Sequence, residues 1–152
     1  MDIFFYALKT CSNNIIHSLT VIYMMSAFLD KPAREIMSTP VVTVLFSDPV
    51  ISAVNKMITH DIGAVVVMMG GQPVGIITER DILKRVVLEE RNPRTTMCQD
   101  VMSKPLITIR PDTPLGEAIS IMQKNSIRRL PVVERGELRG IITEKDIIRK
   151  II

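Results

Sequence analysis

The stretch that decides the fold is Gly75-Ile76-Ile77-Thr78-Glu79-Arg80-Asp81-Ile82, which returns 65 residues later as Gly140-Ile141-Ile142-Thr143-Glu144-Lys145-Asp146-Ile147. The repeat extends toward the N-terminus without a gap, because Met37-Ser38-Thr39-Pro40 recurs as Met102-Ser103-Lys104-Pro105. Duplicated supersecondary units of this size bury their apolar faces against each other. The sequence therefore predicts two copies of one small unit, related by a pseudo-twofold axis, with two equivalent clefts.

Each copy is expected to fold as β-α-β-β-α. Apolar and β-branched residues predict a strand at 41–44, and a proline at the first helical position predicts the start of a helix at Pro49. Two apolar runs then flank Gly70-Gly71, which predicts a hairpin, and Thr78 is a good N-cap for a closing helix over 79–88. The second copy repeats this order, with a strand at 106–109, a helix from Pro114, a hairpin around Gly136 and, after Thr143, a helix over 144–151.

The fold class is therefore α/β (α+β), and the repeat divides the chain. Residues 33–88 form the first repeat, 89–99 a charged connector and 100–152 the second repeat. Residues 1–32 are an N-terminal extension containing an apolar-leaning run of 15 residues, Ile15–Leu29, shorter than the roughly 20 residues of a spanning helix. Three interpretations of the extension stay open: an anchor or signal segment, a helix that packs on the domain or a dimer partner, and a translation start at Met24 or Met25.

The composition limits the possible functions. Because 47% of residues are hydrophobic and only 4% aromatic, with no Trp, the core is expected to consist of Ile, Val, Leu and Met. Cys11 and Cys98 are isolated, which gives no support for zinc or thiol redox chemistry and favours a reducing, cytoplasmic location. The net charge of +3 comes from residues 88–152, with twelve basic and nine acidic side chains. This excess is too weak and dispersed to predict a nucleic-acid surface by itself.

The leading candidates for a functional site are Thr78 and Asp81, with their counterparts Thr143 and Asp146. Thr-x-x-Asp at a helix start is typical of a capping box, in which the acidic side chain returns to the N-cap amide. The same geometry can bind a ligand. A carboxylate can accept both hydroxyls of a ribose, and a helix N-terminus can bind phosphate. Both interpretations stay open from the residues alone.

Catalysis is not expected. The chain has two histidines, and His60 is expected at the end of a helix in a capping or surface role. No Ser-His-Asp, Cys-His or paired-carboxylate pattern can be assembled. We therefore expect no catalytic residues, no metal and no required cofactor.

The order of landmarks from residue 33 to residue 152 resembles the CBS domain, whose tandem pair is called a Bateman module. The resemblance implies a regulatory module without catalysis that senses an adenosine-containing ligand such as AMP, ADP, ATP or S-adenosylmethionine. It also implies a conformational change transmitted to an unidentified protein partner, and a stand-alone pair that forms a homodimer.

The resemblance also implies which residues line the two clefts. Arg129 takes the phosphate-contacting position of nucleotide-binding members of the family, and Arg128 replaces their histidine. The tighter cleft is then expected to comprise Arg128, Arg129, Thr143 and Asp146, with Val41 and Val42, beside Met37, as an apolar wall. The second cleft is expected to comprise Thr78, Asp81, Leu106 and Ile107, without a cation.

Two other functions stay open. A nucleic-acid-binding or transcription-linked adaptor would use the basic second half and bind DNA in a salt-dependent way. A purely structural protein-interaction module would leave both clefts empty. A membrane partner is not expected.

Overall fold

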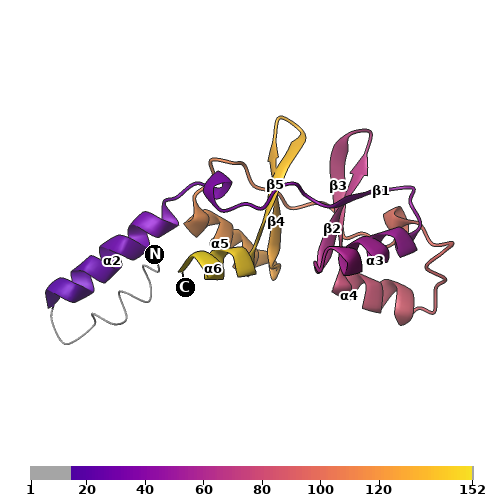
Figure 1. Ribbon diagram of the computed structural model, residues 1–152, viewed down its shortest axis with the longest axis horizontal. Helices are drawn as coiled ribbons and strands as arrows, with labels where there is room; N and C mark the ends of the chain where they lie inside the picture. The colour runs from indigo at the N-terminus through magenta and orange to yellow at the C-terminus, as the bar shows by residue number, and fades with distance from the viewer. Residues whose placement is uncertain (1–14, 152) are drawn as a thin grey trace. The chain divides into compact units, whose positions relative to one another are not determined.

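The structure is a computed structural model that describes residues 15–151 of the chain, with side chains described from residue 18 onward. Figure 1 shows the path of the chain through its helices and strands. Their order is α2 (Ile15–Leu29), η1 (Ala33–Glu35), β1 (Thr43–Leu45), α3 (Val50–Thr59), β2 (Ala64–Met69), β3 (Gln72–Thr78), α4 (Glu79–Ile82), η2 (Leu83–Val87), η3 (Cys98–Asp100), α5 (Leu115–Asn125), β4 (Arg129–Glu134), β5 (Glu137–Thr143) and α6 (Glu144–Ile151).

The chain divides into two compact units that cut across the sequence repeats. Of the described residues, unit 1 comprises 15–39, 108–133 and 140–151, and unit 2 comprises 40–107 and 134–139. Each unit therefore contains a short segment from the neighbouring repeat. We call residues 33–38 and the equivalent residues 98–103 the crossover segments.

Unit 2 is built on a three-stranded sheet in the order β1-β2-β3. β1 runs parallel to β2 and β2 antiparallel to β3, and the hairpin turns at Gly70 and Gly71, both with positive φ. Helix α3 packs on β1 and β2, and α4 packs against β3 (Figure 1). The core between them is aliphatic, as the composition predicts: Val44, Val50, Ala53, Met57, Val65, Val67, Ile77, Val86, Cys98 and Val101.

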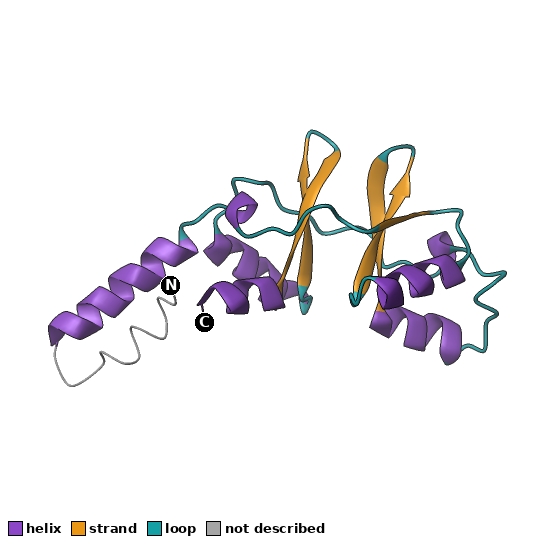
Figure 2. Ribbon diagram, viewed as in Figure 1, coloured by secondary structure: helices purple, strands orange, loops and turns teal. Residues whose placement is uncertain are grey.

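Unit 1 contains the two-stranded β4–β5 hairpin except for its tip, residues 134–139, and α5 and α6 lie on the same side of the hairpin (Figure 2). The prediction of a strand over 106–109 is wrong in extent, because in this segment only Ile109 forms a β-bridge, which is parallel and pairs with Val132. In unit 2 the Val66 amide donates to the Val42 carbonyl, but the equivalent of Val66 is Pro131, which has no amide hydrogen. The ladder therefore cannot extend to Ile107.

The helix boundaries differ from the predictions at two places. Pro49 and Pro114 are N-caps with extended ψ of 146°, so α3 and α5 begin one residue later than expected. The first closing helix changes from α to π winding at Leu83, whereas α6 covers 144–151 as predicted. Position 60 was predicted correctly, since His60 is the exposed C-cap of α3.

The crossover segments and the residues just before them form backbone hydrogen bonds with the starts of the core helices α3 and α5. The Ala33 amide donates to the Thr113 carbonyl at 2.8 Å, and the Leu115 amide donates to the Lys31 carbonyl at 2.9 Å. Unit 2 repeats both bonds at the equivalent positions, from Cys98 to Asp48 and from Val50 to Thr96. Because the first amides of a helix have no partner within the helix, these backbone bonds fix each crossover segment to the start of a core helix.

Candidate ligand-binding sites

The Asp81 site lies in unit 2, where β3 ends and α4 begins. The Asp81 carboxylate accepts the Thr78 amide at 2.9 Å, and the Thr78 hydroxyl accepts the Asp81 amide at 3.3 Å. This reciprocal pair is a capping box, as the Thr-x-x-Asp pattern indicates. The Thr78 hydroxyl also lies 3.0 Å from Asp81 Oδ2, and the Asp81 side chain is only 7% exposed.

The crossover segment of unit 2 brings a further hydroxyl to this carboxylate. Ser103 and Ile76 exchange backbone hydrogen bonds, which hold residue 103 beside β3. The Ser103 hydroxyl then donates to Asp81 Oδ1 at 2.8 Å. Both oxygens of Asp81 are therefore occupied by groups of the chain itself.

The Asp146 site in unit 1 has the same plan with looser contacts. The Asp146 carboxylate accepts the Thr143 amide at 2.9 Å, and the Thr143 hydroxyl accepts the Asp146 amide at 3.2 Å. The Ser38 hydroxyl lies 3.4 Å from Asp146 Oδ1, at the outer limit of a hydrogen bond. Asp146 is half-buried and Ser38 is exposed, so this carboxylate is more accessible than Asp81.

Sequence reasoning missed the role of Ser38 and Ser103. Both serines were visible as part of the recurring Met-Ser-x-Pro pattern, but nothing in the local sequence connects them to Asp146 or Asp81. The preceding methionines explain a further repeated feature, the glycines of β3 and β5. A Cβ at Gly75 would lie 2.5 Å from Met102 Sδ, and one at Gly140 would lie 2.6 Å from Met37 Sδ.

The two arginines expected at the phosphate position differ in their surroundings. Arg129 is half-buried at the start of β4 and forms no ion pair with any residue in the range 18–151. Arg128 is 80% exposed on its side chain, and its Nε lies 3.8 Å from Glu144 Oε2. Of these two arginines, Arg129 is therefore the one without an ion pair to a described residue, and its role stays a prediction.

The apolar walls predicted for the clefts stay predictions as well. Leu106 and Ile107 are half-buried and belong to unit 2, together with Thr78 and Asp81. Val42 packs against the core of unit 2, and Val41 is half-buried in the same unit. Arg129, Thr143 and Asp146 belong to unit 1.

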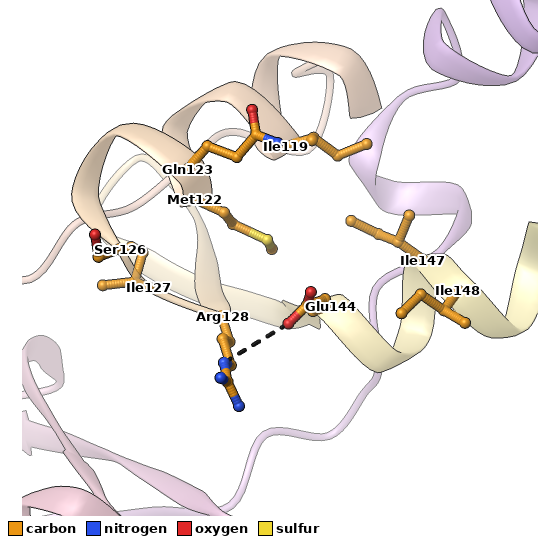
Figure 3. A pocket seen from close by; sticks show the side chains of 9 residues that line it. All are labelled: Ile119, Met122, Gln123, Ser126, Ile127, Arg128, Glu144, Ile147 and Ile148. Atoms are coloured by element: carbon orange, nitrogen blue, oxygen red, sulfur yellow. Dashed lines mark ion pairs between the residues drawn. The ribbon is translucent and has the colours of Figure 1, made fainter.

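An open groove of about 430 Å³ lies between α5 and α6 in unit 1. Figure 3 shows Met122, Ile147 and Ile119 facing this groove, with the Arg128–Glu144 pair at its edge. Its lining residues are Ile119, Met122, Gln123, Ser126, Ile127, Arg128, Glu144, Ile147 and Ile148. Thr143, Asp146 and Arg129 do not line it, so Arg128 is the predicted nucleotide contact that this groove shares.

The remaining chemical features are few. Within residues 18–151, no group of three or more His, Cys, Asp or Glu side chains is arranged to hold a metal ion. Burial, together with the negative charge of Asp48, raises the pKa of the Cys98 thiol to about 11.

None of the described helices has the length and apolar character needed to cross a membrane. Helix α2 covers the apolar run Ile15–Leu29, while residues 1–14 lie outside the described part.

The profile of the CBS domain matches residues 33–88 and again residues 98–152, so the chain belongs to the CBS domain family with two copies in tandem. Tandem CBS pairs are regulatory rather than catalytic modules that commonly bind adenosine nucleotides. The resemblance read from the repeated motifs is thereby confirmed, as is the mixed α/β fold class.

Similar proteins include the uncharacterized protein MK0525 of Methanopyrus kandleri, 38% identical over 76% of this chain and 60% of its own length. The CBS domain-containing protein YhcV of Bacillus subtilis is 33% identical over 75% of this chain and 81% of its own length. The crystal structure of the CBS domain of a CBS domain-containing membrane protein from Sphaerobacter thermophilus is 27% identical. It has a TM-score of 0.77 and covers 91% of this chain and 99% of that one. The chain spans 32% to 60% of the length of several curated relatives.

Proposed function

We propose that this chain binds an adenosine-containing ligand (AMP, ADP, ATP or S-adenosylmethionine) and that its tighter site is the one built on Asp146 and Arg129. The observation that carries the proposal is the state of the two carboxylates. Asp146 is half-buried and only weakly engaged by Ser38, whereas Asp81 is occupied on both oxygens. An accessible carboxylate can accept ribose hydroxyls, and a guanidinium without a protein counter-ion can bind phosphate through two parallel hydrogen bonds.

Calorimetric titration of the full chain with AMP, ADP, ATP and S-adenosylmethionine tests this proposal. A matched pair of ligands isolates the ribose contact, because 2′,3′-dideoxy-AMP lacks both hydroxyls and keeps the base and phosphate. We expect AMP to bind at least about tenfold more tightly than the dideoxy compound, since hydrogen bonds to charged groups contribute about 1.5–3 kcal/mol each. Equal affinities would rule out the carboxylate–diol contact, and no binding by any of the four ligands would refute the proposed function.

We further propose that the chain assembles as a homodimer and relays binding to a protein partner. Each unit exposes apolar side chains at equivalent helix positions, including Leu83 in unit 2 and Ile148 in unit 1. A dimer would have a mass of about 34 kDa, twice the chain mass of 17.1 kDa. Light scattering is expected to give this value at micromolar concentration, and a monomer would contradict the assembly.

We also propose that the protein is located in the reducing cytoplasm. The thiol of Cys98 is free and buried, in keeping with this location.

The apolar groove between α5 and α6 favours a second candidate function, a protein-interaction module. Under that function both nucleotide sites are empty, and the groove of about 430 Å³ is the surface that binds a protein partner. Ile148→Asp places a charge on the groove without touching Asp146. The second function is favoured if Ile148→Asp abolishes partner binding or dimerisation and AMP titration of the wild type shows no binding.

A further inference from the structure

The crossover segment of unit 2 is held by a side chain that unit 1 lacks. Arg85 Nη1 donates to the carbonyl oxygens of Val101 at 2.9 Å and Met102 at 2.8 Å, and the Arg85 side chain is half-buried. These two carbonyls directly precede Ser103, whose hydroxyl donates to Asp81. Arg85 therefore fixes the backbone from which the serine reaches the carboxylate.

The position equivalent to Arg85, 65 residues later, is Lys150. Lys150 is exposed, and no hydrogen bond joins it to the crossover segment 33–38 within the described part of the chain. An ammonium group cannot replace a guanidinium here, because the planar fork of Arg presents several fixed donors and Lys offers one compact charge on a flexible stem. The helices differ as well, since Arg85 lies in the π-helical turn η2 while Lys150 lies in the regular helix α6.

The difference in restraint matches the difference in the carboxylates. Where the arginine holds the crossover segment, the serine–aspartate distance is 2.8 Å and Asp81 is 7% exposed. Where lysine stands instead, the Ser38–Asp146 distance is 3.4 Å and Asp146 is half-buried. A ligand hydroxyl at Asp81 must displace Ser103, whereas one at Asp146 displaces only a weak contact.

We propose that Arg85 is a positioning residue that keeps Ser103 on Asp81, so that the chain itself occupies the Asp81 site and weakens ligand binding there. We call this arrangement of Arg85, Ser103 and Asp81 the latch. Its effect on ligand affinity rests on the proposed function, but the latch itself can be measured without a ligand. Ligand binding at Asp81 then requires the crossover segment to move, because Ser103 also exchanges two backbone hydrogen bonds with Ile76.

The first test uses the full chain without ligand. Hydrogen exchange by NMR compares the Ser103 and Ile76 amides of unit 2 with the equivalent Ser38 and Ile141 amides of unit 1. We expect slower exchange in unit 2, and Arg85→Lys should accelerate exchange at Ser103 and Ile76 about tenfold. Lys150→Ala is the matched control and should leave Ser38 and Ile141 unchanged. Unchanged exchange at Ser103 in Arg85→Lys would overturn the latch.

The second test measures AMP affinity in an Asp146→Ala background, where the remaining site is Asp81. Arg85→Lys and Ser103→Ala are each expected to tighten AMP binding about three- to tenfold, because the internal competitor for the carboxylate is weakened or removed. Ser38→Ala in an Asp81→Ala background is the control and should change affinity less than twofold. A merely structural role of Arg85 predicts weaker or unchanged binding, and either result would overturn the proposal.

The two tests separate failure of the latch from failure of the proposed function. If the wild type binds no nucleotide but Arg85→Lys accelerates exchange at Ser103, the latch stands as a restraint and the nucleotide function fails. If AMP binds and neither variant changes affinity or exchange, the function stands and the latch fails. Melting curves of each variant verify that the chain is folded under both measurements.

Discussion

The Asp81 and Asp146 sites start from the same residue types at the same spacing, yet their carboxylates are not equivalent. Asp81 receives the Thr78 amide, the Thr78 hydroxyl and the Ser103 hydroxyl, and it is almost fully buried. Asp146 receives the Thr143 amide and a long contact from Ser38. The comparison shows that the local motif builds the helix cap in both copies, while residues outside the motif decide how available the carboxylate is.

The largest expected effect is on the free energy of unfolding, which should fall more when Asp81 is replaced than when Asp146 is replaced. Asp81→Ala leaves the Thr78 amide and the Ser103 hydroxyl without their acceptor in a buried site, and should lower the free energy of unfolding by about 3 kcal/mol. Asp146→Ala should cost only about 1 kcal/mol, because its site is more accessible to water. Urea unfolding of both variants measures the difference. Equal losses would show that capping alone accounts for both residues.

The second prediction concerns ligand affinity and Arg129 of unit 1. Arg129→Ala should weaken the tighter nucleotide site about ten- to hundredfold, since a charge-assisted hydrogen bond contributes about 1.5–3 kcal/mol. Asp146→Ala should damage the same site, and Asp81→Ala should not. Arg135→Ala, in the exposed turn between β4 and β5, removes the same charge as a control. Calorimetry with AMP and ATP in which Arg129→Ala and Arg135→Ala behave alike would refute the phosphate role.

The third prediction uses Cys98, whose equivalent in unit 1 is Ala33. The thiol ordinarily ionises near pH 9.0, and in the folded chain its pKa is raised to about 11 by burial and the charge of Asp48. The folded state therefore disfavours the thiolate, so this contribution to stability is fully present below pH 9 and is lost as pH rises toward 11. The loss is roughly 2 kcal/mol.

Cys98→Ala makes unit 2 resemble unit 1 at this position and should flatten the alkaline loss. Chemical denaturation of wild type and variant between pH 8 and about 11 measures it, with Lys and Tyr titration common to both proteins. Parallel pH profiles would show that the thiol does not control alkaline stability.

The smallest effect is expected from the Arg128–Glu144 pair, which is exposed and long at 3.8 Å. The equivalent positions in unit 2 are Gly63 and Glu79, so that unit has no such pair. Arg128→Ala should change the free energy of unfolding by less than about 0.5 kcal/mol, and the change should vanish at high salt. A larger, salt-insensitive loss measured by urea titration would mean that the Arg128 stem packs on the groove beside Glu144.

Much of the fold could be predicted because each repeat carries its own local signals. Gly70-Gly71 marks the hairpin, and Thr78 and Thr143 mark the starts of the closing helices. The strand at 106–109 could not be predicted correctly, because apolar composition favours a strand whereas the missing amide of Pro131 prevents the ladder. The π winding of η2 likewise has no signal in Leu83–Val87 that distinguishes it from the regular helix α6.

The sequence by itself determined the duplication, the family and the Thr–Asp pairs, because these depend on residue types at short, constant spacing. Only the tertiary structure decided that segments 33–38 and 98–103 join the unit of the other repeat, and that Ser103 and Arg85 reach the Asp81 site. Those contacts join residues 16 to 22 positions apart in the chain. Hydrogen-bond strength depends on tenths of an ångström between such groups, and spacing along the chain does not encode that distance.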